Sequence, residues 1–97
     1  MFQSGRHNSA RLLALRSVEN ELEWSRYAYA IPKRVGKAVV RNRLRRRLRD
    51  ILRLTALKEG FDLVISARNE AALASFQTLK AELLLLLKRA QLLQDQE

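Results

Sequence analysis

The sequence contains no cysteine, one proline, three glycines and one histidine, and only 6% of its residues are aromatic. The absence of cysteine excludes disulfides, cysteine-ligated zinc and cysteine nucleophiles, and it fits a reducing cytoplasmic location. The longest apolar run covers residues 83–87, far short of the roughly 20 residues that span a bilayer. The first residues also lack the apolar segment of a signal peptide. We therefore expect a soluble cytoplasmic protein with no membrane partner.

The sequence also contains no recognisable motif for catalysis by the protein alone. His7 has no partner at metal-ligand spacing, so we interpret it as a surface residue and predict no metal site. No nucleophile triad, carboxylate pair or glycine-rich phosphate loop stands out. What the chain does have is a hydrophobic fraction of 47% in 97 residues, enough for one small folded domain over residues 1–97.

Positive charge is concentrated in one segment, residues 33–53. This segment holds ten Lys or Arg and a single acid, Asp50, whereas the other 76 residues hold nine bases and nine acids. The segment therefore accounts for the whole formal net charge of +9. A basic block in an otherwise neutral chain is typical of proteins that bind a polyanion.

The hydrophobic pattern predicts an α+β fold. Alternating apolar and polar residues, or short apolar runs, indicate strands at residues 10–18, 26–31 and 61–67. Apolar residues recur with a period near 3.6 over residues 38–57 and 76–93, which indicates two helices. Because the first two strands are joined by a short connection, we expect them to pair antiparallel. We expect Gly60 to follow the end of the first helix and Ser75 to cap the second. The order β, β, α, β, α predicts an open sheet with helices packed on it.

The first helix is predicted to bury one stripe and to display an arginine-rich face. Val40, Leu44, Leu48 and Ile51 fall within one stripe, and the opposite side collects most of the basic side chains. Arginine forms bidentate contacts with phosphate and stacks on bases. Asp50 alone cannot offset the mutual repulsion of so many arginines, so the pattern favours a polyanionic partner over an inert solvated face.

The run from Lys33 to Arg46 resembles the signature of the bacterial ribonuclease P protein subunit. The signature centres on Arg41-Asn42-Arg43, preceded by a Lys/Arg pair, a glycine and Ala-Val. Phe2 to Gly5 is similar to the Phe-x-x-Gly that ends the first helix of the family. The resemblance implies a two-layer α/β sandwich with a small mixed sheet, a basic central helix in a left-handed β-α-β crossover, and a C-terminal helix. It also implies a helix before Phe2, so we expect the true start to lie upstream of Met1, which mass spectrometry of the native N-terminus would test.

The resemblance further implies a function and a set of site residues. Members of this family join a catalytic RNA to form the endoribonuclease that removes the 5′ leader from precursor tRNA, and the RNA, not the protein, holds the catalytic Mg²⁺. In this family the protein binds the leader in a cleft on the sheet and helps the RNA to bind the metal. The positions matching the RNA-facing motif and its basic surroundings are Lys33, Arg34, Lys37, Arg41, Asn42, Arg43, Arg45, Arg46 and Arg49. Phe2 matches an aromatic position of the family's leader-binding cleft. Tyr27 and Tyr29 are further candidates for leader binding, because aromatic side chains beside basic ones suit single-stranded RNA, and packing in the core or on the sheet face is their alternative. The resemblance implies no catalytic residue in the protein and no protein oligomer.

Other functions remain as alternatives. A non-enzymatic RNA-binding protein of the ribosomal type could use the same basic helix. A DNA-binding helix would offer suitable Arg and Asn side chains, but no helix-turn-helix pattern precedes it. A membrane-surface helix would need bulky aromatic residues, which residues 38–57 lack.

Overall fold

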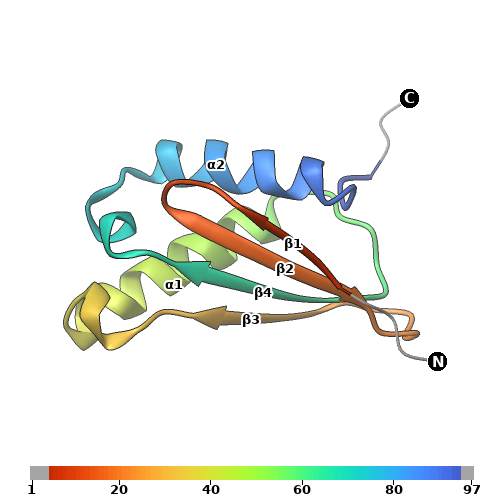
Figure 1. Ribbon diagram of the computed structural model, residues 1–97, viewed down its shortest axis with the longest axis horizontal. Helices are drawn as coiled ribbons and strands as arrows, with labels where there is room; N and C mark the ends of the chain where they lie inside the picture. The colour runs from red at the N-terminus through yellow and green to blue at the C-terminus, as the bar shows by residue number, and fades with distance from the viewer. Residues whose placement is uncertain (1–4, 95–97) are drawn as a thin grey trace.

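The fold is an α+β sandwich in which two helices cover one face of a four-stranded mixed sheet. The computed structural model describes residues 5–94 (Figure 1). Its elements, in chain order, are β1 (Arg6–Ser9), β2 (Leu13–Glu19), β3 (Arg26–Ala30), the short 3-10 helix η1 (Lys33–Val35), α1 (Ala38–Arg53), β4 (Phe61–Ala67), the 3-10 helix η2 (Asn69–Leu73) and α2 (Phe76–Arg89). The predicted fold class, with its mixed sheet and two helices, is confirmed.

The strand order, β1-β2-β4-β3, differs from the sequence-based expectation. The prediction that the first two predicted strands form an antiparallel pair is wrong, because β4 lies between β2 and β3. β2 pairs antiparallel with β4, with Leu15 opposite Ile65, and β3 pairs parallel with β4, with Tyr29 opposite Ile65. β1 was not predicted; it pairs antiparallel with β2 and forms one edge of the sheet.

The β3-α1-β4 unit is the left-handed crossover implied by the resemblance. In Figure 1, β3 and β4 both run toward the left, β4 lies above β3, and α1 returns behind them. Nearly all such crossovers are right-handed, because the twist of the strands favours that connection. The left-handed connection places α1 on the same side of the sheet as α2, so both helices share one core.

The core lies between this helical layer and one face of the sheet. Alternate strand residues point into it, among them Leu13 and Leu15 of β2 and Leu63 and Ile65 of β4. From α1, the buried residues are Leu44, Leu48, Ile51 and Leu52. Three members of the predicted stripe are therefore buried, whereas Val40 is half-buried near the start of the helix. The opposite face of the sheet carries no helix (Figure 1).

The ends of α1 show how local chemistry sets its bounds. Gly36 precedes the helix because space is tight there: a Cβ at this position would lie 3.0 Å from Val40 Cγ1. The helix ends at Arg53, four residues earlier than the pattern suggested, and the Thr55 hydroxyl donates to the Ile51 carbonyl at 2.7 Å. Gly60 does not cap the helix as predicted; its φ of +91° instead makes the turn into β4.

The cap of α2 is as predicted, because the Ser75 hydroxyl accepts a hydrogen bond from the Thr78 N–H at 3.1 Å. The helix ends at Arg89 and not at Leu93, which forms an isolated bridge with Leu57. Within the leucine run of residues 83–87, Leu84 packs partly against the core and Leu85 is 43% exposed.

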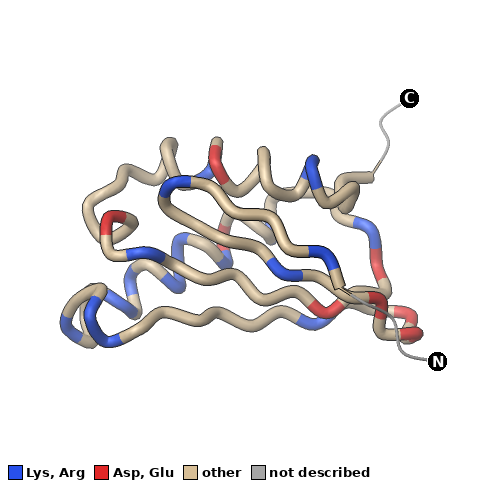
Figure 2. The backbone as a smooth tube through the Cα atoms, in the orientation of Figure 1, with Lys and Arg blue, Asp and Glu red and all other residues tan. Residues whose placement is uncertain are grey.

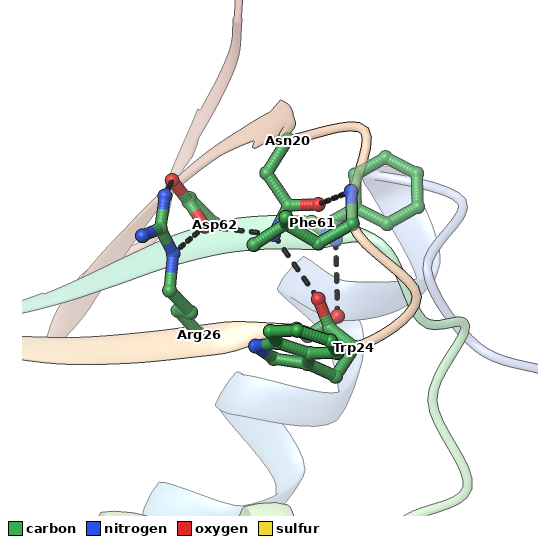
Figure 3. A network of polar contacts seen from close by, with 7 residues as sticks. Asn20, Trp24, Arg26, Phe61 and Asp62 are labelled. Carbon is green, nitrogen blue, oxygen red and sulfur yellow. Dashed lines mark hydrogen bonds and ion pairs between the residues drawn. The ribbon is translucent and has the colours of Figure 1, made fainter.

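The connection between β2 and β3 is held by polar contacts rather than by burial (Figure 3). The Asn20 amide donates to Asp62 Oδ1 and to the Trp24 carbonyl, and the Arg26 guanidinium makes two hydrogen bonds, of 2.9 and 2.7 Å, to the Asp62 carboxylate. Trp24 is 58% exposed, so it is not a core anchor. No helix within residues 5–94 is long and apolar enough to cross a membrane.

Candidate nucleic-acid interface

The predicted basic residues form a continuous exposed surface along η1 and α1. Figure 2 shows Lys and Arg following these two elements, while Asp and Glu gather around the connection between β2 and β3. Of the nine predicted RNA-binding residues, seven are exposed and two, Arg41 and Arg45, are half-buried. The helix period brings Asn42, Arg45, Arg46 and Arg49 onto the solvent side because the opposite side is occupied by core leucines.

Three side chains of α1 are fixed by hydrogen bonds. Arg41 Nε donates to the Gly36 carbonyl at 3.0 Å, and Arg45 Nη1 donates to Asn42 Oδ1 at 2.9 Å. Arg47 reaches the other way and donates to the Ala74 carbonyl at 3.2 Å, which ties α1 to the turn before α2. Arg41 and Arg47 thus have structural contacts, whereas Arg43, Arg46 and Arg49 make no hydrogen bond within the described part of the chain.

The charge of this surface is largely uncompensated. Across residues 5–94, the one salt bridge on α1 joins Arg53 Nη1 to Asp50 Oδ1 at 3.7 Å, and both side chains are well exposed. Such a pair contributes little to stability. The remaining arginines of the helix repel one another, so a bound polyanion would lower the free energy of this face.

A second feature lies on the helix-free face of the sheet, where a shallow groove of about 730 Å³ crosses β2 and β4. Its floor is made of small side chains, Ala14, Ala30 and Ser66. The cationic side chains at its rim are Arg11, Arg34 and Arg68, with His7 beside them and the single acid Glu70. Arg16 and Val64 line an adjoining hollow that shares the same floor. A shallow groove with cationic edges suits an extended polyanionic strand.

The wall of the groove is held by the turn between β1 and β2. The Glu82 carboxylate of α2 accepts hydrogen bonds from the backbone N–H groups of Leu12 and Leu13, both at 2.7 Å. The Arg68 N–H donates to the Leu12 carbonyl, and Arg68 Nε donates to the Ala10 carbonyl at 3.1 Å. Arg11 and Arg68 are therefore positioned by the same turn.

The two tyrosines predicted to bind the leader do not line this groove. Tyr27 and Tyr29 point to the helix-covered side of β3, as their register opposite Leu63 and Ile65 requires. Tyr29 packs partly against the core, and Tyr27 is 39% exposed. Burial raises the pKa of both phenols; the charge of Glu59 raises the Tyr27 pKa further, whereas the charge of Arg49 opposes the rise in the Tyr29 pKa. Phe2 lies outside the described residues, so its predicted role stays a prediction.

Sequence reasoning missed the groove residues His7, Arg11, Arg16 and Arg68. Arg16 could have been found from the alternation in β2, since it lies one residue from the buried Leu15 and must face the opposite side of the sheet. Arg68 and Arg11 meet only through the pairing of β2 with β4, which has no local signal. Within the described residues, no group of three or more His, Asp or Glu is placed to hold a metal ion.

Comparisons with known proteins give one consistent result. The family model described as ribonuclease P matches residues 1–91. The ribonuclease P protein component of Caldanaerobacter subterraneus is 35% identical over the whole chain and 85% of its own length, and that of Dehalococcoides mccartyi is 41% identical over 93% of the chain and 75% of its own length. Among solved structures, the RNase P protein of Thermotoga maritima matches with a TM-score of 0.81 and 31% identity, covering 88% of this chain and 85% of that one. The RNase P protein of Staphylococcus aureus, at 22% identity and a TM-score of 0.84, covers 93% of this chain and 84% of its own and shares the fold.

Proposed function

The chain belongs to the ribonuclease P protein family, and from this premise we propose that it is the protein subunit of an RNA-based endoribonuclease that removes the 5′ leader from precursor tRNA. The observation that carries the proposal is the pair of cationic features on one small domain: an exposed arginine helix and a separate groove on the open sheet face. A holoenzyme that binds both a structured RNA and a single-stranded leader needs two such features.

In this proposal, α1 and η1 dock on the catalytic RNA. Arg41, Asn42 and Arg43 lie in the first two turns of α1, and the exposed arginines that follow extend the contact along the helix. Arginine is suited to this task because its planar guanidinium makes paired hydrogen bonds to phosphate. The positions proposed to contact this RNA remain the nine predicted from the sequence, and one of them, Arg34, also lines the groove.

The leader would lie in the groove of the helix-free sheet face. Arg11, Arg16, Arg34 and Arg68 can neutralise its phosphates while the small side chains of the floor let an extended strand approach closely. The positions of Tyr27 and Tyr29 do not support a role for them in this groove.

The bond cleavage itself would be carried out by the RNA. Mg²⁺ supplies the activated water in this chemistry, and the cationic side chains of α1 would not hold such an ion, because Asp50 is the single acid of the helix. The chain would instead offset phosphate charge where the two RNAs meet, which permits the RNA to bind Mg²⁺ at lower concentration.

The test is cleavage of a precursor tRNA by ribonuclease P RNA from the same organism, at low Mg²⁺, with and without this chain. We expect cleavage at the mature 5′ end to depend on the added chain at low Mg²⁺ and to become independent of it at high Mg²⁺. If the chain binds that RNA no better than it binds an unrelated structured RNA and stimulates no cleavage, the proposal is wrong.

A further inference from the structure

The edge formed by β3 places aromatic rings beside the flank of the basic helix. β3 pairs with β4 on one side only, so its other side is the edge of the sheet. Tyr27 and Tyr29 lie on the face that α1 covers, and the helix period places Arg45, Arg49 and Arg53 on one flank of α1. Figure 1 shows α1 crossing behind β4, between α2 and the β3 edge. Arg47, on the opposite flank of α1, donates to the Ala74 carbonyl just before α2, so the flank that carries Arg49 lies toward the β3 edge.

The electrostatics of the two tyrosines agree with this placement. The positive charge of Arg49 opposes the rise in the Tyr29 pKa that burial causes. Tyr27 has a different neighbour, since the negative charge of Glu59 acts on it and adds to its raised pKa. The helix flank places Arg49 toward the Tyr29 end of the edge, whereas Glu59, whose carboxylate accepts a hydrogen bond from the Ser25 N–H at 2.8 Å, lies toward the Tyr27 end.

We propose that Tyr29 and Arg49 form a contact site for one unpaired nucleotide of the catalytic RNA, so that the β3 edge extends the RNA-docking surface of α1. The inference rests on the proposed function, and it removes Tyr29 from leader binding. The Tyr29 ring is half-buried, so only its exposed part is available to a nucleotide. A base can stack on that part while Arg49 binds the adjoining phosphate. A duplex would not serve, because its bases are already stacked and paired.

The acidic neighbourhood of Tyr27 makes it an internal control. A phosphate near Glu59 would be repelled, so Tyr27 should contribute little even though it is the more exposed of the two rings. Exposure alone would predict the opposite ranking, which makes the comparison of the two tyrosines informative.

The experiment measures binding of the full chain to the catalytic RNA alone, without precursor tRNA. Tyr29→Leu removes the ring but keeps an apolar side chain, Tyr29→Phe keeps the ring, and Tyr27→Leu is the matched control. We expect Tyr29→Leu to weaken binding about 5- to 20-fold, within the range reported for loss of base stacking. Tyr29→Phe should bind like the unaltered chain, and Tyr27→Leu should change the affinity less than about 2-fold, below any stacking contribution. Arg49→Gln should weaken binding and reduce the salt dependence by about one counterion.

A second measurement separates RNA contact from packing. p-Benzoylphenylalanine placed at position 29 should crosslink to the catalytic RNA in the holoenzyme. The contribution of the leader is measured by the ratio of the holoenzyme's affinities for precursor tRNA with a long leader and without one. This ratio should be the same for Tyr29→Leu and the unaltered chain.

Each remaining outcome overturns a stated part of the reasoning. Unchanged RNA affinity for Tyr29→Leu, or crosslinks from position 29 to the leader alone, would overturn this site while leaving the proposed function intact. An unaltered chain that does not bind the catalytic RNA would overturn the proposed function itself. If Tyr29→Leu fails to fold, the crosslink from position 29 decides the question.

Discussion

Glu82 provides the sharpest test of how the fold supports the groove. Its carboxylate accepts two backbone hydrogen bonds of 2.7 Å, from Leu12 and Leu13, across 70 and 69 residues of sequence. Both leucines are almost fully buried, so their N–H groups have little access to water. Replacing Glu82 by Ala would leave two donors without their acceptor, and replacing it by Gln would keep a neutral acceptor of similar shape.

The magnitude follows from the type of hydrogen bond. A hydrogen bond to a charged group contributes about 1.5–3 kcal/mol and a neutral one about 0.5–1.5 kcal/mol. The site is only partly buried and one oxygen serves both donors, so we expect Glu82→Ala to lower the free energy of unfolding by about 2–4 kcal/mol and Glu82→Gln by roughly half as much. Because the same turn positions Arg11 and Arg68, the leader-dependent part of precursor tRNA affinity should fall as well.

Urea denaturation with an unchanged m-value would measure the first effect, and affinity for precursor tRNA with and without a leader would measure the second. Glu23→Gln is the matched control, because Glu23 is exposed and has no hydrogen bond in the described structure; it should alter stability by less than about 0.5 kcal/mol. Equal stability of the Glu82→Ala and Glu23→Gln variants would show that the Glu82 carboxylate does not stabilise the turn between β1 and β2.

Three further predictions concern the core, the interface and pH. Leu48→Ala, at a fully buried position of α1, should lower the free energy of unfolding by about 2–5 kcal/mol in a denaturation experiment; a loss below 1 kcal/mol would contradict the assigned core. Arg43→Ala, at an exposed position, should leave the melting temperature unchanged but weaken binding to the catalytic RNA and slow cleavage at limiting Mg²⁺; cleavage equal to that of the unaltered chain would refute the motif assignment. The pKa of Asp62 is lowered from 3.8 to about 2, chiefly by its hydrogen bonds with Arg26 and then Asn20, so its contribution to stability is present above about pH 4 and is lost as the pH falls toward 2. Between pH 4 and pH 2, the free energy of unfolding of an Asp62→Asn variant should therefore fall less steeply than that of the unaltered chain. An equal pH dependence in the two proteins would count against the pairing of Asp62 with Arg26.

The sequence predicted the elements whose signal is local. The strand Phe61–Ala67 has the predicted bounds, because a compact apolar run with β-branched residues marks it clearly. The start of α1 at Ala38 and the cap of α2 at Ser75 follow from equally local patterns. The end of α1 was placed too late, because Leu54 and Leu57 continue the apolar content although Leu57 belongs to the loop that pairs with Leu93.

The arrangement of the strands could not be predicted in the same way. A short connection between two strands usually makes them neighbours, but here β4 enters between them after the crossover. β1 is polar at every position, so it shows no alternation of apolar and polar residues. It forms a strand because its backbone pairs with that of β2. The basic surface was predictable because it lies on one helix. A cleft on the sheet was implied by the resemblance alone, and its lining residues were not predicted, because they come from four separate segments.

The segment between β3 and α1 explains why one small domain can have two cationic surfaces. Arg34 lies in η1 and lines the groove. Lys37 is the residue just before α1, and Arg41 of the helix donates back to the Gly36 carbonyl. Only a few residues therefore connect the groove on one face of the sheet with the helix on the other. The left-handed crossover makes this possible, because it returns α1 beneath β3 and β4 and leaves their other face free. If, as proposed, a leader lies in the groove and an RNA docks on α1, the short turn of residues 32–37 would set the distance between them.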